Sequence, residues 1–101
     1  MSTNELTVIA ELVAAPGRRE ELIAILAPLF DAAADEPGTL GYAMYLDVQD
    51  KDTVWFHERY ESKEALLAHG ASQVLAQVTE AMTPVLARPA DIRVTRAARS
   101  I

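Results

Sequence analysis

Two stretches near the middle of the chain have the pattern of β-strands that are apolar on both faces. Successive side chains of a strand point to opposite faces, so a strand with one solvated face alternates between apolar and polar residues. In residues 53–60 the large apolar side chains of Phe56 and Trp55 fall on opposite faces. In residues 39–48 one face carries Leu40, Tyr42, Met44 and Leu46, and the other carries Gly41, Ala43 and Tyr45. We therefore expect helices on one face and a second copy of the chain on the other, in a homodimer.

The remaining patterns set the order in which these strands combine with helices. The expected elements are a strand at 5–14, a helix at 18–36, strands at 39–48 and 53–60, helices at 63–69 and 72–85, and a strand at 91–97. This order is the split β-α-β plan of an α+β, ferredoxin-like fold, in which helices cover one face of a four-stranded antiparallel sheet. The chain has 101 residues and no internal repeat, so we expect a single domain over residues 1–101.

Pro28 lies inside the first predicted helix, where a proline removes one backbone hydrogen bond. The apolar residues nevertheless keep their helical spacing beyond it, through Leu29 and Ala33. We therefore expect one continuous helix with a kink near Ala24.

The composition excludes several classes of function. The net charge is −6, from 15 acidic and 9 basic residues, whereas a nucleic-acid-binding face needs an excess of basic side chains. The chain has no cysteine, which excludes disulfides and thiolate ligands. It also has no cluster of histidines and no glycine-rich phosphate loop, so we expect neither a metal nor a flavin. No apolar run is long enough to cross a membrane and the N-terminus lacks a signal-peptide pattern, so we expect a cytoplasmic protein.

Both histidines of the chain lie between residues 55 and 72. His69 shares a helical face with Leu66, and we expect both side chains to point toward the sheet and to contribute to a binding site there. A neutral imidazole is a suitable general base near pH 7, which makes His69 the candidate catalytic residue. The alternative is a structural histidine that only hydrogen-bonds a strand carbonyl. His57 falls on the strand face opposite Phe56, and we interpret it as a surface or interface residue.

The strand that precedes His69 carries the other candidate binding residues. Glu58 shares one strand face with Phe56 and Tyr60, whose rings could stack on a flat aromatic ligand. A carboxyl group at such a position either has a charged partner or has a raised pKa. Tyr45 and Tyr42 are candidates for a hydrogen bond to the substrate, and the choice between them depends on which face of the sheet meets the helices.

Three stretches resemble the antibiotic biosynthesis monooxygenase domain family. They read TVIAELVAAPGRREEL, EPGTLGYAMYLD and FHERYESKEALLAHGAS. The resemblance covers about residues 5–97 and implies a dimeric ferredoxin-like α/β barrel. It also implies cofactor-independent oxidation of a quinol or other electron-rich aromatic by O2, and His69 matches a family position. The partners implied are a second copy of the chain, a small aromatic substrate and O2.

The sequence departs from this family at positions that bear on its chemistry. Phe56 stands where one branch tends to have an asparagine, and Val74 stands where many quinol-oxidising relatives have a second histidine. The positions that mark the haem-degrading branch are occupied by Ala10, His69 and Thr79, so we exclude haem degradation. Two other functions stay open: isomerisation of a small carbonyl metabolite on the same fold, and ligand binding by a non-catalytic dimer.

Overall fold

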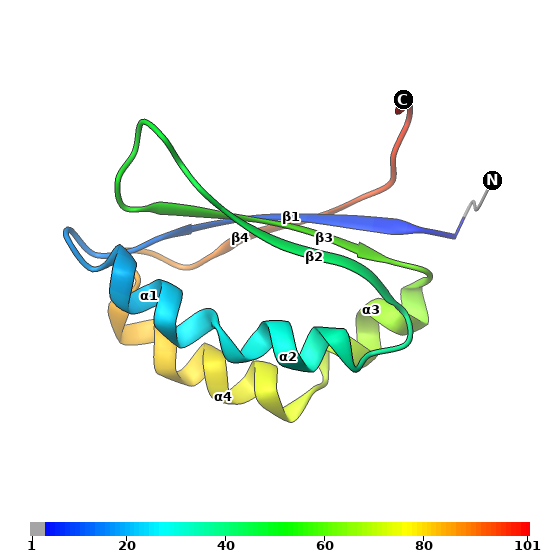
Figure 1. The fold of residues 1–101 in the computed structure, drawn as a ribbon, viewed down its shortest axis with the longest axis horizontal. Helices are drawn as coiled ribbons and strands as arrows, with labels where there is room; N and C mark the ends of the chain where they lie inside the picture. The colour runs from blue at the N-terminus through cyan, green and yellow to red at the C-terminus, as the bar shows by residue number, and fades with distance from the viewer. Residues whose placement is uncertain (1–3) are drawn as a thin grey trace.

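A computed structural model describes residues 4–101, in which a four-stranded sheet is covered by helices on one face (Figure 1). The elements are β1 (Leu6–Val13), α1 (Arg19–Leu26), α2 (Pro28–Ala34), β2 (Thr39–Leu46), β3 (Thr53–Tyr60), α3 (Lys63–Gly70), α4 (Gln73–Met82), a 3₁₀ helix (Thr83–Val85) and β4 (Asp91–Thr95). The strand order is β2-β3-β1-β4, and neighbouring strands are antiparallel. The predicted α+β, ferredoxin-like fold is confirmed. In the part of the chain that the structure describes, no helix has the length and apolar character needed to cross a bilayer.

The hydrophobic core lies between the sheet and the helices. β1 buries every second side chain on this face, namely Leu6, Val8, Ala10 and Leu12. The antiparallel register sets Phe56 of β3 opposite Ala10, and Glu58 opposite Val8, so that these side chains share the helix-facing side. Leu22, Leu26 and Leu29 of α1 and α2 close the core from below, and burial of each such side chain stabilises the fold by about 1.5–3 kcal/mol.

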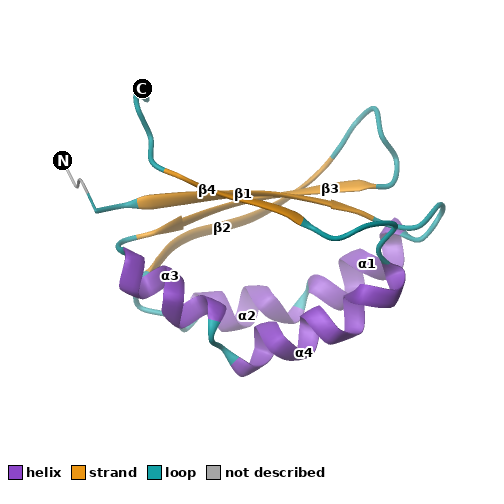
Figure 2. Cartoon of the chain, turned by 180° about the vertical axis from the view of Figure 1, so that it is seen from behind, coloured by secondary structure: helices purple, strands orange, loops and turns teal. Residues whose placement is uncertain are grey.

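The opposite face of the sheet has no helix on it within residues 4–101 (Figure 2). Two large apolar side chains on this face are well exposed, Ile9 at 41% and Tyr45 at 56%. Arg59 forms an ion pair with Glu5 at 2.9 Å, and the indole N–H of Trp55 donates a hydrogen bond to Asp47 at 2.9 Å. The expected second copy of the chain on this face stays a prediction.

The helix interruption lies at Ala27 rather than near Ala24, which corrects the expected position of the kink. Pro28 has no N–H, so the carbonyl of Ala24 receives a 3.4 Å bond from the N–H of Ala27 instead. The segment is therefore two helices, and not one continuous helix. Ala27 keeps helical dihedral angles, and both Leu29 and Ala33 are buried, so the apolar face passes through the junction as expected.

Candidate functional site

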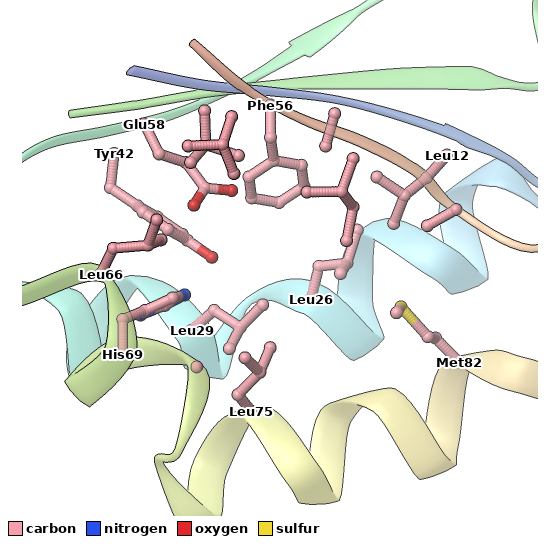
Figure 3. A pocket seen from close by; sticks show the side chains of 16 residues that line it. Leu12, Leu26, Leu29, Tyr42, Phe56, Glu58, Leu66, His69, Leu75 and Met82 are labelled. Atoms are coloured by element: carbon pink, nitrogen blue, oxygen red, sulfur yellow. The ribbon is translucent and has the colours of Figure 1, made fainter. Parts of the chain in front are cut away.

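A cavity of about 200 Å³ lies between the sheet and the helices (Figure 3). Most of its wall is apolar, including Leu12, Leu26, Leu29, Phe56, Leu75 and Met82. The wall becomes polar at one end, where Tyr42 of β2, Glu58 of β3 and His69 of α3 point toward one another. An apolar cavity with a few convergent polar groups is the usual form of a small-molecule site.

His69 is buried, with 5% of its surface exposed, and its ring points into the cavity (Figure 3). Nδ1 of the ring lies 3.0 Å from Oε1 of Glu36 and 3.3 Å from Oε2. The hydroxyl of Thr39 donates to the same Oε1 atom at 2.7 Å. Nε2 has no hydrogen-bond partner among residues 4–101, so it is the ring nitrogen left for a ligand.

Local packing explains why Glu36 reaches His69. Gly38 lies against the first turn of α3, and a Cβ atom at Gly38 would collide with Ala65. That turn is fixed by Ser62, whose hydroxyl oxygen accepts the N–H of Ala65 at 3.1 Å. His69 lies four residues after Ala65, on the same helical face, so the loop that packs on Ala65 brings Glu36 to the ring.

Glu58 is the second titratable group at the polar end, and only 8% of it is exposed. Burial raises the pKa of its carboxyl group above the ordinary value. The hydroxyl of Tyr60, which donates to Oε1 at 2.5 Å, opposes this shift, as does a positive charge on His69 whenever its ring is protonated, while the charge of Glu36 adds to it. The group therefore keeps its proton to a higher pH than an exposed glutamate does.

Tyr42 completes the polar end from the strand next to Glu58. The two residues are direct partners in the β2–β3 register, and the rings of Tyr42 and His69 have centroids 5.4 Å apart. Burial raises the pKa of the Tyr42 hydroxyl, and the charges of Glu58 and Glu36 raise it further. The hydroxyl therefore stays protonated and can donate a hydrogen bond into the cavity, where Figure 3 shows it.

Four of the six predicted site residues line this one cavity: Phe56, Glu58, Leu66 and His69. Tyr60 lies behind the wall instead, fully buried, where it contacts Glu58 and stacks near the ring of His69 at a centroid distance of 5.4 Å. Tyr45 does not reach the cavity, because it lies on the opposite face of the sheet. The register pairs Tyr42 with Glu58 and Tyr45 with Trp55, so Tyr42 is the tyrosine of β2 that faces the helices.

Sequence reasoning missed Glu36 and Thr39. Glu36 lies 33 residues before His69, and the contact depends on how one loop packs on one helix. No periodic pattern reports such a contact. The only signal near it is the EPG stretch at residues 36–38, which marks the turn and contributes to the family resemblance.

The fold and the cavity together define a small ferredoxin-like α+β protein with a ligand-sized site between its sheet and helices. Residues 6–81 match the profile described as antibiotic biosynthesis monooxygenase, and the chain belongs to this family. Membership supports a monooxygenase-like role in general terms and leaves the substrate open.

Individual proteins are similar to this chain in sequence, and two of them in structure. The structure of Rv0793 from Mycobacterium tuberculosis is 26% identical, with a TM-score of 0.88 over 95% of this chain and 97% of its own. A Caulobacter crescentus protein whose name places it among the antibiotic biosynthesis monooxygenases is 25% identical, with a TM-score of 0.89 over 97% of this chain and 93% of its own. The uncharacterized protein sll1783 of Synechocystis is 25% identical over 94% of this chain, which spans 65% of the length of that relative.

Proposed function

We propose that the protein is a monooxygenase that oxidises an uncharged phenol or quinol with O2, without a metal or flavin. The observation that carries the proposal is a cavity-facing imidazole, on His69, at the polar end of a mostly apolar cavity. Molecular oxygen is a triplet and reacts slowly with closed-shell organic molecules. An electron-rich phenolate can give it the first electron, so a base in a site that excludes water supplies what the reaction needs.

In the proposed reaction the substrate hydroxyl lies near Tyr42 and His69 and gives its proton to Nε2. The phenolate then transfers one electron to O2, and the aryloxyl radical and superoxide combine at a ring carbon. The proton held by His69 returns to the peroxide, and loss of water leaves a quinone, so one oxygen atom enters the product and the other leaves as water. The protonated hydroxyl of Tyr42 stabilises the phenolate oxygen by donating a hydrogen bond.

The charge and size of the cavity restrict the proposed substrate. Among the described residues, no lysine or arginine lines the cavity, whereas Glu58 lines it and Glu36 lies just behind His69. A carboxylate or phosphate group would therefore meet negative charge with no counterion, which argues against an isomerase of phosphorylated metabolites. A cavity of roughly 150 Å³ can hold benzene, so the observed volume suits one or two aromatic rings.

We further propose that the protein is a homodimer joined through the sheet face that carries Ile9 and Tyr45. Both side chains are exposed in the single chain, and exposed apolar surface favours association. A stable dimer should bury at least about 1,200 Å² in total. This interface would lie on the far side of the sheet from the cavity, so each subunit would keep its own site.

Oxygen uptake by metal-stripped protein tests the proposed reaction. A panel of one- and two-ring phenols and quinols should include at least one that consumes O2 and gives a quinone in equal amounts. Matched compounds with an added carboxylate should react far more slowly. Tight binding of phenols with no O2 consumption would instead identify a ligand-binding protein.

A further inference from the structure

We infer that Glu36 is a positioning residue that fixes His69 in the one neutral tautomer able to act as a base in the cavity. The inference extends the proposed function and rests on it for the catalytic consequence. It assigns to Glu36 no contact with the substrate, because Glu36 lies behind the imidazole ring and is absent from the cavity wall.

The contact between Glu36 and His69 specifies which ring nitrogen carries the hydrogen. An ionised carboxylate only accepts hydrogen bonds, so Nδ1, at 3.0 Å from Oε1, must be the donor. In a neutral ring the other nitrogen, Nε2, then has the free lone pair. Nε2 is also the nitrogen with no partner among residues 4–101, so the lone pair is available to a substrate hydroxyl.

No other group that the structure describes around the ring is placed to perform this task. The titratable side chains near His69 are Glu36, Glu58, Tyr42 and Tyr60. The rings of both tyrosines are tilted relative to the imidazole, with centroid distances of 5.4 Å, and the carboxyl group of Glu58 is hydrogen-bonded to Tyr60. Within residues 4–101, Glu36 is the residue that forms a hydrogen bond with the imidazole.

The surroundings of Glu36 keep it in this orientation. Its Oε1 atom accepts a second hydrogen bond from Thr39 at 2.7 Å, and the N–H of Thr39 donates to the backbone carbonyl of Glu36 at 3.1 Å. Because Gly38 has no side chain, this loop can lie against α3. When Nε2 takes the substrate proton, the resulting imidazolium faces a carboxylate that already holds its other nitrogen, which stabilises the charged intermediate state.

The test uses the tautomer of His69, which can be read by ¹⁵N NMR of the full chain without any substrate. Free neutral histidine favours the Nε2–H form, so the opposite form is diagnostic. We expect the Nδ1–H form for His69 in the wild type and a shift toward Nε2–H in Glu36→Gln. The His57→Gln variant assigns the two histidine signals, and Asp35→Asn, which removes a neighbouring exposed acid, should leave the His69 signal unchanged.

Kinetics on a phenol that the wild type oxidises give the second readout. Glu36→Gln should lower kcat by about 10- to 100-fold, the usual effect of an outer partner of a functional histidine, with little change in KM. Asp35→Asn should retain the wild-type kcat. A wild-type His69 in the Nε2–H form would overturn the inference, as would a Glu36→Gln variant that loses thermal stability but keeps tautomer and kcat. If no phenol is oxidised, the proposed function fails, whereas the NMR result still decides the role of Glu36.

Discussion

The two faces of the sheet carry the same residue types in opposite environments. On the helix-facing side, His69 and Glu58 are almost fully buried and line a cavity with few polar partners. On the other side His57 is exposed, and Glu5 forms an ion pair with Arg59 that is partly open to solvent. Burial, and not residue type, therefore distinguishes the histidine and the glutamate of the proposed site from those of the other face.

The histidines give the largest expected difference between the two faces. If His69 is the base that ionises the substrate, His69→Ala should lower turnover by about 10²–10⁴-fold while the fold is retained. His57→Ala is the matched control on the other face and should keep wild-type turnover. Rates and thermal unfolding should be measured on the same preparations. Unchanged turnover in His69→Ala together with lower stability would show that the histidine has only a packing role.

Two neighbouring aromatic residues give the next difference, in stability. Phe56 lies in the core and is 3% exposed. Phe56→Ala should therefore lower the free energy of unfolding by about 3–5 kcal/mol. Trp55 lies on the other face, is only half-buried and donates one hydrogen bond to Asp47. Trp55→Ala removes that bond but should lower the free energy of unfolding by less than Phe56→Ala does. Denaturant unfolding of both variants measures the difference. Equal costs would mean that the far face is as well packed as the core, as in a very tight dimer.

The proposed dimer provides a third comparison. Ile9→Glu replaces an exposed apolar side chain of the helix-free sheet face with a charged one and should dissociate the dimer at micromolar concentration without affecting the cavity. Val48→Glu adds the same charge at a loop position that is 98% exposed and should leave the dimer intact. Sedimentation velocity distinguishes the two variants. A wild-type protein that is already monomeric at these concentrations would disprove the interface.

The smallest expected effects are two changes of stability with pH, which have opposite signs. Burial raises the pKa of Glu58, so the folded protein holds this proton more tightly than the unfolded chain. Stability should therefore fall as pH rises from the ordinary glutamate range through the raised pKa, and Glu58→Gln should remove that loss. The Glu58→Gln variant should melt at a higher temperature than the wild type only at pH values above the ordinary glutamate range. At lower pH the wild-type carboxyl group is neutral as well, so the two proteins should melt alike.

Glu5 should behave in the opposite way, because its hydrogen bond and ion pair with Arg59 lower the pKa of its carboxyl group. Its contribution is present above the ordinary glutamate pKa and is lost as pH falls through the lowered value. Glu5→Gln should therefore reduce the melting temperature slightly at neutral pH and not in acid, and the effect should shrink in high salt. Melting curves of both glutamate variants across pH 3–8 test the pair. If the melting temperatures of both variants differed from that of the wild type in the same direction at neutral pH, the contrast between the two faces would be contradicted.

The fold could be predicted because it depends on periodic patterns. Alternation in the strands and helical spacing between them gave the element order, and the split β-α-β plan followed. Pro28 was harder, because a proline can bend a helix or divide it, and the choice depends on how the freed carbonyl of Ala24 is satisfied.

The site could be predicted only in part, for a related reason. His69, Phe56 and Glu58 were found because strand and helix periodicity places each of them on a face. Which tyrosine of β2 joins them depends on the cross-strand register, and that register is set by tertiary pairing. Glu36 could not be predicted from the sequence, because its contact with His69 depends on one loop that packs against α3 at Gly38.

The place of Trp55 has a practical consequence for optical experiments. It is the only tryptophan of the chain, and its indole lies on the sheet face away from the cavity, hydrogen-bonded to Asp47. Its fluorescence should therefore respond to association of the far faces and vary with protein concentration. Filling of the cavity should leave the emission almost unchanged, so a ligand can bind there without an optical signal from this residue.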